Sequence, residues 1–199
     1  MKTRLSANAA ALCLATATLS GCAGPRQAHY YTLPPVSGQG ESAIPATAAT
    51  QEKLIYLRAV RIPELMKRPE IVARRAGTNT VDIQNDALWA GDISAAVAKQ
   101  FALALEQAQP GSLVFNAPLV PDAEPDLFYT IEIERLDGVR GGNVELQMRW
   151  TARESAAGRT EHGRYSETLP TENDSVDAYV ATLSELIRRA ALSLSEHAD

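Results

Sequence analysis

The sequence predicts an α+β fold in a single domain, with a mixed or antiparallel sheet packed on one side by two amphipathic helices. The first observation is the alternation of apolar with mostly polar residues over 127–136 and again over 143–153, which is typical of strands with one buried face. The second is a helical period that starts at Trp89, from which apolar residues recur at four-residue steps. The third is the i, i+3, i+4 spacing of apolar residues from Val176 to Leu194, which indicates the second helix.

One buried strand and one hairpin are predicted ahead of the first helix. Residues 53–62 are apolar on both faces, which fits a largely buried strand that ends at Pro63. Residues 70–76 and 79–84 flank Gly77, as expected for the two arms of a hairpin.

The remaining elements follow in chain order. The first helix is expected to stop at 110–111, a Pro-Gly pair that cannot continue a helix. A short strand is expected at 113–115, and the polar strand 159–169 is expected at or near an edge of the sheet. Asp174 or Ser175 is expected to cap the second helix, because both side chains accept hydrogen bonds from a first-turn N–H.

The N-terminus has the features of a secretory signal peptide over residues 1–21. Two basic residues precede an apolar run of about a dozen residues, whereas a membrane-spanning helix needs roughly 20. Ser20 and Gly21 then lead to Cys22, and this pattern resembles the bacterial lipobox. The resemblance implies cleavage before Cys22, attachment of a diacylglycerol to its thiol and acylation of the new amine. The alternative is an ordinary cleaved signal peptide that leaves a free thiol.

Residues 22–29 are interpreted as a short lipidated tether, and 30–199 as the domain. Three acyl chains bury far more methylene groups than a single myristoyl chain, so the attachment would be stable. The tether extends at most about 25 Å if a strand begins at 30–33, and the composition of 36–52 is that of a long loop. In enterobacterial lipoproteins an aspartate after the cysteine retains the protein at the inner membrane, so Ala23 favours the outer membrane.

Charge and cysteine content exclude two classes of protein. Removing residues 1–21 takes away two basic and no acidic residues, so the net charge moves from −5 to −7, and a nucleic-acid-binding role is not expected. Cys13 leaves with the signal peptide and Cys22 is acylated, so the folded part contains no cysteine for a disulfide.

No catalytic or metal-binding pattern emerges from the sequence, and we predict neither an enzyme nor a cofactor beyond the covalent lipid on Cys22. The three histidines, His29, His162 and His197, do not have zinc-ligand spacing. The sequence contains neither a G-x-S-x-G nucleophile elbow nor a G-x-x-x-x-G-K-[ST] phosphate loop. Trp89 lies on an apolar stripe and is predicted to be part of the core, as is Trp150.

Several segments resemble one family of lipoproteins. They are Y-Y-T-L-P soon after the cysteine, I-P-E-L-M-K-R-P-E-I-V from Ile62, N-T-V-D-I, and L-W-A-G-D-I before an alanine-rich helix. Together they resemble the ABC-type transport auxiliary lipoprotein family, which includes the paraquat-inducible protein C-like lipoproteins. Arg74 and Arg75 depart from many relatives, in which more apolar or serine content is expected.

The resemblance implies an outer-membrane lipoprotein on the periplasmic face that supports membrane integrity. It would work with a mammalian-cell-entry (MCE) domain protein and with ABC transporter and permease subunits to move lipids, above all phospholipids, between the inner and outer membranes. The ATPase and the lipid tunnel would belong to other subunits, which agrees with the missing phosphate loop.

The family motif includes a loop that we interpret as partner-binding. Carried over to this sequence, the motif falls on Pro63, Leu65, Arg68, Pro69, Ile71, Val72 and Trp89. Two prolines make the loop stiff, so it has little conformational entropy to lose on binding, and Leu65 and Met66 offer apolar surface. The hypothesis assigns Pro63, Leu65, Met66, Arg68 and Pro69 to a partner contact. In the alternative, the loop only ties two strands together, with Leu65 in the core.

Two other functions stay open at this stage. One is a free-standing envelope lipoprotein that binds a small amphiphile or stabilises the cell envelope. The other is a periplasmic hydrolase, for which the sequence offers the least support. A polar edge strand and a short tether would also leave a surface free for a homo-oligomer.

Overall fold

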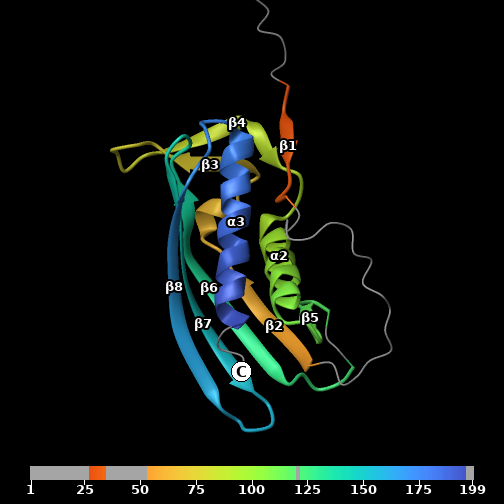
Figure 1. Cartoon of the computed structure of the whole chain (residues 1–199). Coiled ribbons are helices and arrows are strands. Elements are labelled where there is room, and N and C mark those ends of the chain that lie inside the picture. Colours follow the sequence, from red (N-terminus) through yellow and green to blue (C-terminus); the bar gives the residue numbers. More distant parts are fainter. Residues whose placement is uncertain (1–26, 35–52, 120–121, 196–199) are drawn as a thin grey trace, which may run out of the picture.

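The computed structural model describes residues 27–34, 53–119 and 122–195, and its two helices lie against the same face of a long sheet (Figure 1). The predicted α+β class and its two helices are confirmed. The signal peptide, Cys22 and the predicted loop 36–52 lie outside the described residues.

Five strands form the large sheet, in the order β5-β2-β6-β7-β8. They are β2 (Lys53–Arg61), β5 (Ser112–Asn116), β6 (Leu127–Gly138), β7 (Asn143–Glu154) and β8 (Thr160–Pro170). β2 runs parallel to both β5 and β6, whereas β6, β7 and β8 are successive antiparallel neighbours. The sheet is therefore mixed, and β8 forms the polar edge that the sequence predicted.

Alternation decides which side of this sheet is covered. Along β6, the side chains of Tyr129, Ile131 and Ile133 are buried under the helices, whereas Glu132 and Glu134 are exposed on the other face. These two carboxylates pair with one guanidinium on β7: Arg149 lies 3.3 Å from Glu132 and 2.8 Å from Glu134. Pairs so exposed contribute little to stability.

A second sheet of three strands was not predicted. It consists of β1 (His29–Tyr31), β3 (Glu70–Arg74) and β4 (Val81–Trp89), in the order β1-β4-β3. β3 and β4 form the expected hairpin, and β1 adds to β4 in parallel. The sequence pattern indicated each strand but not that they would leave the main sheet.

The first helix begins later than the sequence predicted. Trp89 belongs to β4 because its N–H donates to Pro69 O at 2.7 Å, which extends the hairpin ladder. Helix α2 (Ile93–Ala108) begins after Asp92, whose side chain accepts a hydrogen bond from Ser94 N at 2.8 Å. A helix whose first turn is capped in this way starts at the cap and not at the first apolar residue of the pattern.

Both helices contribute one apolar stripe to the core. Val97, Phe101 and Leu105 of α2 are buried, and α3 (Val176–Ser195) buries Leu183 and Ile187 against them. The predicted cap of α3 is Ser175, whose hydroxyl accepts from Ala178 N at 3.1 Å. Both tryptophans are buried in the core, as predicted. Neither helix is long and apolar enough to cross a bilayer, and the described part of the chain contains no other that is.

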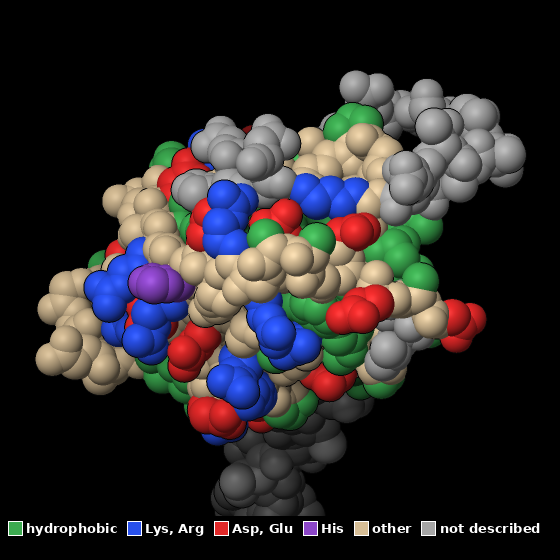
Figure 2. All heavy atoms as spheres, turned by 90° about the horizontal axis from the view of Figure 1, so that it is seen from below, with side chains coloured by type: hydrophobic (Ala, Val, Ile, Leu, Met, Phe, Trp, Pro, Cys, Tyr) green, Lys and Arg blue, Asp and Glu red, His purple; other side chains and the backbone are tan. Residues whose placement is uncertain are grey.

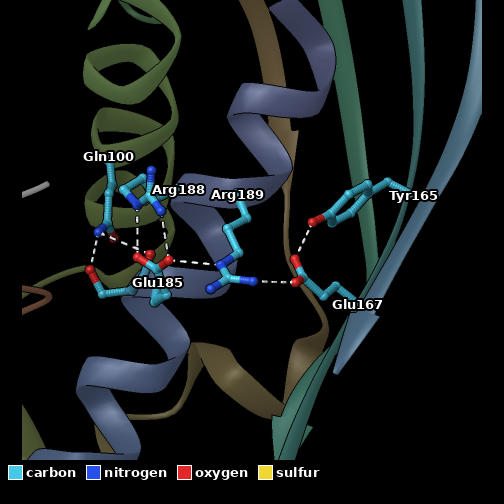
Figure 3. A network of polar contacts seen from close by, with 7 residues as sticks. Gln100, Tyr165, Glu167, Glu185, Arg188 and Arg189 are labelled. Carbon is cyan, nitrogen blue, oxygen red and sulfur yellow. Dashed lines mark hydrogen bonds and ion pairs between the residues drawn. The ribbon is translucent and has the colours of Figure 1, made fainter. Parts of the chain in front are cut away.

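A polar network holds the edge strand β8 to helix α3 (Figure 3). Arg189 of α3 donates to Glu185 one turn earlier and to Glu167 of β8, each at 2.7 Å. Glu167 also accepts a hydrogen bond from the Tyr165 hydroxyl, and Arg188 donates to Glu185 through two nitrogens. Charged groups that fold inward in this way protect an edge strand from pairing with other chains.

Replacement of Gly163 by alanine is expected to destabilise the protein. Gly163 of β8 lies opposite Trp150, and a Cβ there would lie 2.6 Å from Cζ2 of the indole. Overpacking of this kind costs about 1–3 kcal/mol. In Gly91→Ala, the matched control, the new Cβ meets nothing within 4 Å. Urea unfolding should give a lower midpoint for Gly163→Ala only, and equal midpoints would contradict the close packing of β8 on Trp150.

The contribution of Glu185 to stability is expected to depend on pH. Hydrogen bonds from Arg188 lower the pKa of Glu185 to about 2, from an ordinary value of 4.5, against the opposing effect of burial and with a further contribution from Arg189. Because the folded-state pKa is the lower one, ionised Glu185 stabilises the fold above about pH 4.5, and this stabilisation is lost as the pH falls towards about 2.

The test compares urea unfolding of the wild-type protein with that of Glu185→Gln at about pH 7 and about pH 3. Glu185→Gln should be the less stable protein at neutral pH, and the difference in the free energy of unfolding should shrink in acid. A difference that stays constant across this range would show that the carboxylate charge does not stabilise the fold.

Candidate partner-binding loop

The loop that the sequence singled out is fixed at both ends by buried side chains. Ile62 precedes it and Ile71 follows it, and both belong to the hydrophobic core. Between them lies one 3₁₀ turn, η1 (Glu64–Lys67), in which Met66 N donates to Pro63 O at 3.0 Å. Pro69 O accepts from Trp89 N, so the end of the loop is part of a sheet ladder. The backbone of the loop is therefore held in place by the domain itself.

The five residues assigned to a partner contact differ in their exposure. Leu65 is 37% exposed, and Arg68 and Pro69 are also exposed, whereas Pro63 is half-buried. Met66 packs against the core and so presents less surface than the sequence suggested. The side chain that enters the core is therefore Met66 and not Leu65, contrary to the alternative in which Leu65 was buried.

Charges within the loop neutralise one another. Lys67 lies 2.5 Å from Glu64 within the turn, and Arg68 lies 3.3 Å from Glu70 at the start of β3. Both pairs are largely open to solvent, where such pairs contribute little to stability. Leu65 is therefore an exposed apolar side chain in a loop whose charged side chains are paired.

An apolar hollow lies beside the loop. It has a volume of about 220 Å³, and Trp89, whose N–H bonds to the loop, forms part of its wall. The other lining residues are Tyr31, Thr32, Leu33, Ala90, Gly91, Asp92, Ile93 and Ala96. The hollow thus forms where two of the family-like segments, Y-Y-T-L-P and L-W-A-G-D-I, meet. Sequence reasoning missed it, although the small residues of the second segment are the signal that space is left there.

The wall of the hollow includes Tyr31. Burial raises the pKa of the Tyr31 hydroxyl above its ordinary value, and the nearby charges of Asp177 and Asp86 raise it further, with Arg140 opposing them. The phenol therefore stays protonated at neutral pH. The described residues contain no group of three or more His, Cys, Asp and Glu side chains placed to hold a metal ion. His29 and His162 lie on different sheets, and His197 is outside the described residues.

The strand that follows the loop is joined to the large sheet by a buried hydroxyl. Tyr179 of α3 donates to Val72 O at 3.1 Å and accepts from Gly138 N at 3.2 Å. Arg74, one of the two arginines that depart from many relatives, lies 2.8 Å from Asp137 of β6. The other, Arg75, pairs with Asp82 across the hairpin at 2.5 Å. Both arginines thus have partners inside the domain.

Comparison with protein families identifies the family to which this chain belongs. The family described as ABC-type transport auxiliary lipoprotein component matches residues 31–195. The chain belongs to this family. It is a family of transport auxiliary components and not of enzymes, and a lipoprotein family implies a location in the cell envelope.

Solved structures support the fold. One, an uncharacterized protein, shares 17% sequence identity with a TM-score of 0.69, and the match covers 87% of this chain and 99% of the other. A second, from Xanthomonas campestris and assigned to the DUF330 family, shares 14% identity with a TM-score of 0.62 and covers 84% and 93%. At this identity the likeness concerns the fold alone. Among curated proteins, no match was found.

Proposed function

We propose that this protein is an outer-membrane lipoprotein subunit of an MCE-type intermembrane phospholipid transport system. In this proposal, acyl chains on Cys22 hold the chain to the periplasmic face of the outer membrane. The folded domain is a non-catalytic docking and coupling component that binds the MCE-domain protein. The ABC transporter and permease subunits supply the energy for transport. Membership of the transport auxiliary family supports the general role.

The observation that carries the docking role is the fixed loop between two core residues. A backbone held by a 3₁₀ turn and by the bond from Trp89 to Pro69 loses little conformational freedom on binding. Leu65 projects from it as an apolar side chain surrounded by paired charges. Interfaces concentrate their binding energy in a few such apolar anchors with a polar rim.

The apolar hollow favours one alternative, a free-standing envelope lipoprotein that binds a small amphiphile. Its volume of about 220 Å³ is below the roughly 300–1,000 Å³ of most small-molecule pockets. It is large enough for one side chain of a partner. Because the hollow and the loop share Trp89, we favour the docking role over a separate ligand site.

Acylation is tested first. Cys22→Ala is expected to abolish incorporation of labelled palmitate and to move the protein from the outer-membrane fraction to the soluble periplasmic fraction, because no other thiol survives signal cleavage. Cys13→Ala is the matched control, since Cys13 is predicted to leave with the signal peptide, and it should label as well as the wild-type protein. Labelling of Cys22→Ala would refute the anchor.

Docking is tested with two exposed leucines. Leu65→Asp should reduce the MCE-domain protein recovered with the tagged lipoprotein after crosslinking in cells by roughly tenfold or more, as expected for an anchor residue. Leu103→Asp on α2 is the control, because Leu103 is 45% exposed and remote from the loop in sequence. Both variants should keep the wild-type unfolding midpoint. Unchanged recovery with Leu65→Asp, or equal loss in both variants, would count against the loop as the contact.

A further inference from the structure

The three-stranded sheet has one buried face and one uncovered face. On the buried face, Ile71, Ala73 and Trp89 pack into the core. On the other, strand register places Tyr30 beside Leu88 and Val72 beside Ile83. The β3–β4 ladder is irregular between Glu70 and Ile71, where the partner on β4 moves from Leu88 to Gln84. Residues 70 and 72 of β3 still lie on the same side because successive strand residues alternate, and Glu70 pairs with Leu88. The four apolar residues therefore share one surface, here called the outer face: Tyr30, Val72, Ile83 and Leu88.

The outer face is open to solvent. Tyr30 is 68% exposed, the highest value among the large hydrophobic side chains of the described residues, and Ile83 is 39% exposed. Val72 and Leu88 are half-buried. The core residues Ile71, Ala73 and Trp89 lie on the opposite side of these strands, so Tyr30 and Ile83 face solvent on a surface that the described residues cover only in part. Apolar surface that a fold leaves open in this way marks a protein or membrane contact.

The arginines beside the outer face are paired: Arg68 with Glu70, Arg74 with Asp137, and Arg75 with Asp82. Asp86, which lies between Ile83 and Leu88 on β4, is exposed and has no ion pair among the described residues. The rim of the face is thus polar and includes one unpaired carboxylate. The opposite end of the molecule differs, because Figure 2 shows basic and acidic side chains interleaved there. Ion pairs such as Arg159 with Glu154 and Glu161 lie at that end.

The anchor limits how far the outer face can lie from the bilayer. This step rests on the proposed acylation of Cys22. Seven residues, 23–29, separate Cys22 from Tyr30, and a fully extended chain of that length spans at most roughly 25 Å. β1, which carries Tyr30, is therefore the described element closest to the anchor along the chain.

We propose that the outer face rests on the lipid surface of the membrane that holds the anchor. The Tyr30 ring lies at the level of the headgroups with its hydroxyl towards water, the position in which tyrosine is enriched in membrane proteins. Ile83, Val72 and Leu88 contact the boundary of the acyl chains. The domain then has a fixed orientation on the bilayer. Loop 63–69 leads directly into Glu70 at the margin of this face, so a partner meets the loop close to the membrane.

The absence of other free thiols makes this contact measurable. A cysteine introduced at residue 83 or 103 is the only reactive thiol of the acylated protein, because the sequence has two cysteines, one cleaved off and one acylated. The full acylated chain is placed in vesicles of phosphatidylethanolamine and phosphatidylglycerol. Ile83→Cys and Leu103→Cys, whose native side chains are 39% and 45% exposed, are labelled with an environment-sensitive nitrobenzoxadiazole probe.

The expected result is a shift of emission to shorter wavelength, and quenching by brominated phospholipid, at residue 83 and not at residue 103. Equal signals at the two positions, or a water-like signal at both, would overturn the proposal. A shift at residue 83 without quenching by brominated lipid would show that a protein, such as a second copy, covers the face instead. If Ile83→Cys does not fold, Tyr30→Cys takes its place.

Failure of the anchor is seen separately. Flotation with the vesicles is measured before fluorescence. A protein that is not acylated does not float, and this result refutes the anchor and this inference together. Flotation with a water-like probe at residue 83 refutes the lipid contact alone.

Discussion

A buried hydroxyl holds the junction between the two sheets, together with the ion pair of Arg74 and Asp137. Tyr179 of α3 reaches Val72 O in the small sheet and Gly138 N in the large one. Burial raises the pKa of this hydroxyl well above its ordinary value, so it remains a neutral group that donates one bond and accepts another. Backbone groups that end a strand in the interior need such a partner. The position of β3, and hence of the loop before it, follows from this contact.

Sequence patterns predicted the parts of the fold that local chemistry decides. Strands β6 and β7 alternate because one face is buried, and α3 has a continuous apolar stripe below a serine cap. The extension of β4 to Trp89 was missed, because it depends on bonds to Pro69 and, through Ala90, to Tyr31, which are distant in sequence. The division into two sheets depends on similar pairings between distant segments. The periodicity of apolar residues within one segment does not reveal such pairings.

The candidate site was predicted less completely than the fold. Two prolines and the apolar pair Leu65 and Met66 indicated a stiff loop. A turn of four residues is too short to show a periodicity, so the sequence could not tell which of the two side chains is buried. The hollow beside Trp89 arises from the space that Gly91 and Ala96 leave, and these small residues alone do not show which distant segment closes it. Cys22 was singled out because the residues before it resemble the lipobox, a local pattern; its acylation stays a prediction, since Cys22 lies outside the described residues.

The parallel pairing of β2 with β6 has a kinetic consequence. The two strands meet across a long stretch of chain, and Leu54 N donates to the Asp126 carboxylate 72 residues further on. Contacts between such distant segments slow folding, because the entropy of closing the loop is lost before they form. A precursor built this way stays unfolded for longer after synthesis. For an exported polypeptide, that delay favours passage through a narrow translocation channel before the central strands can meet.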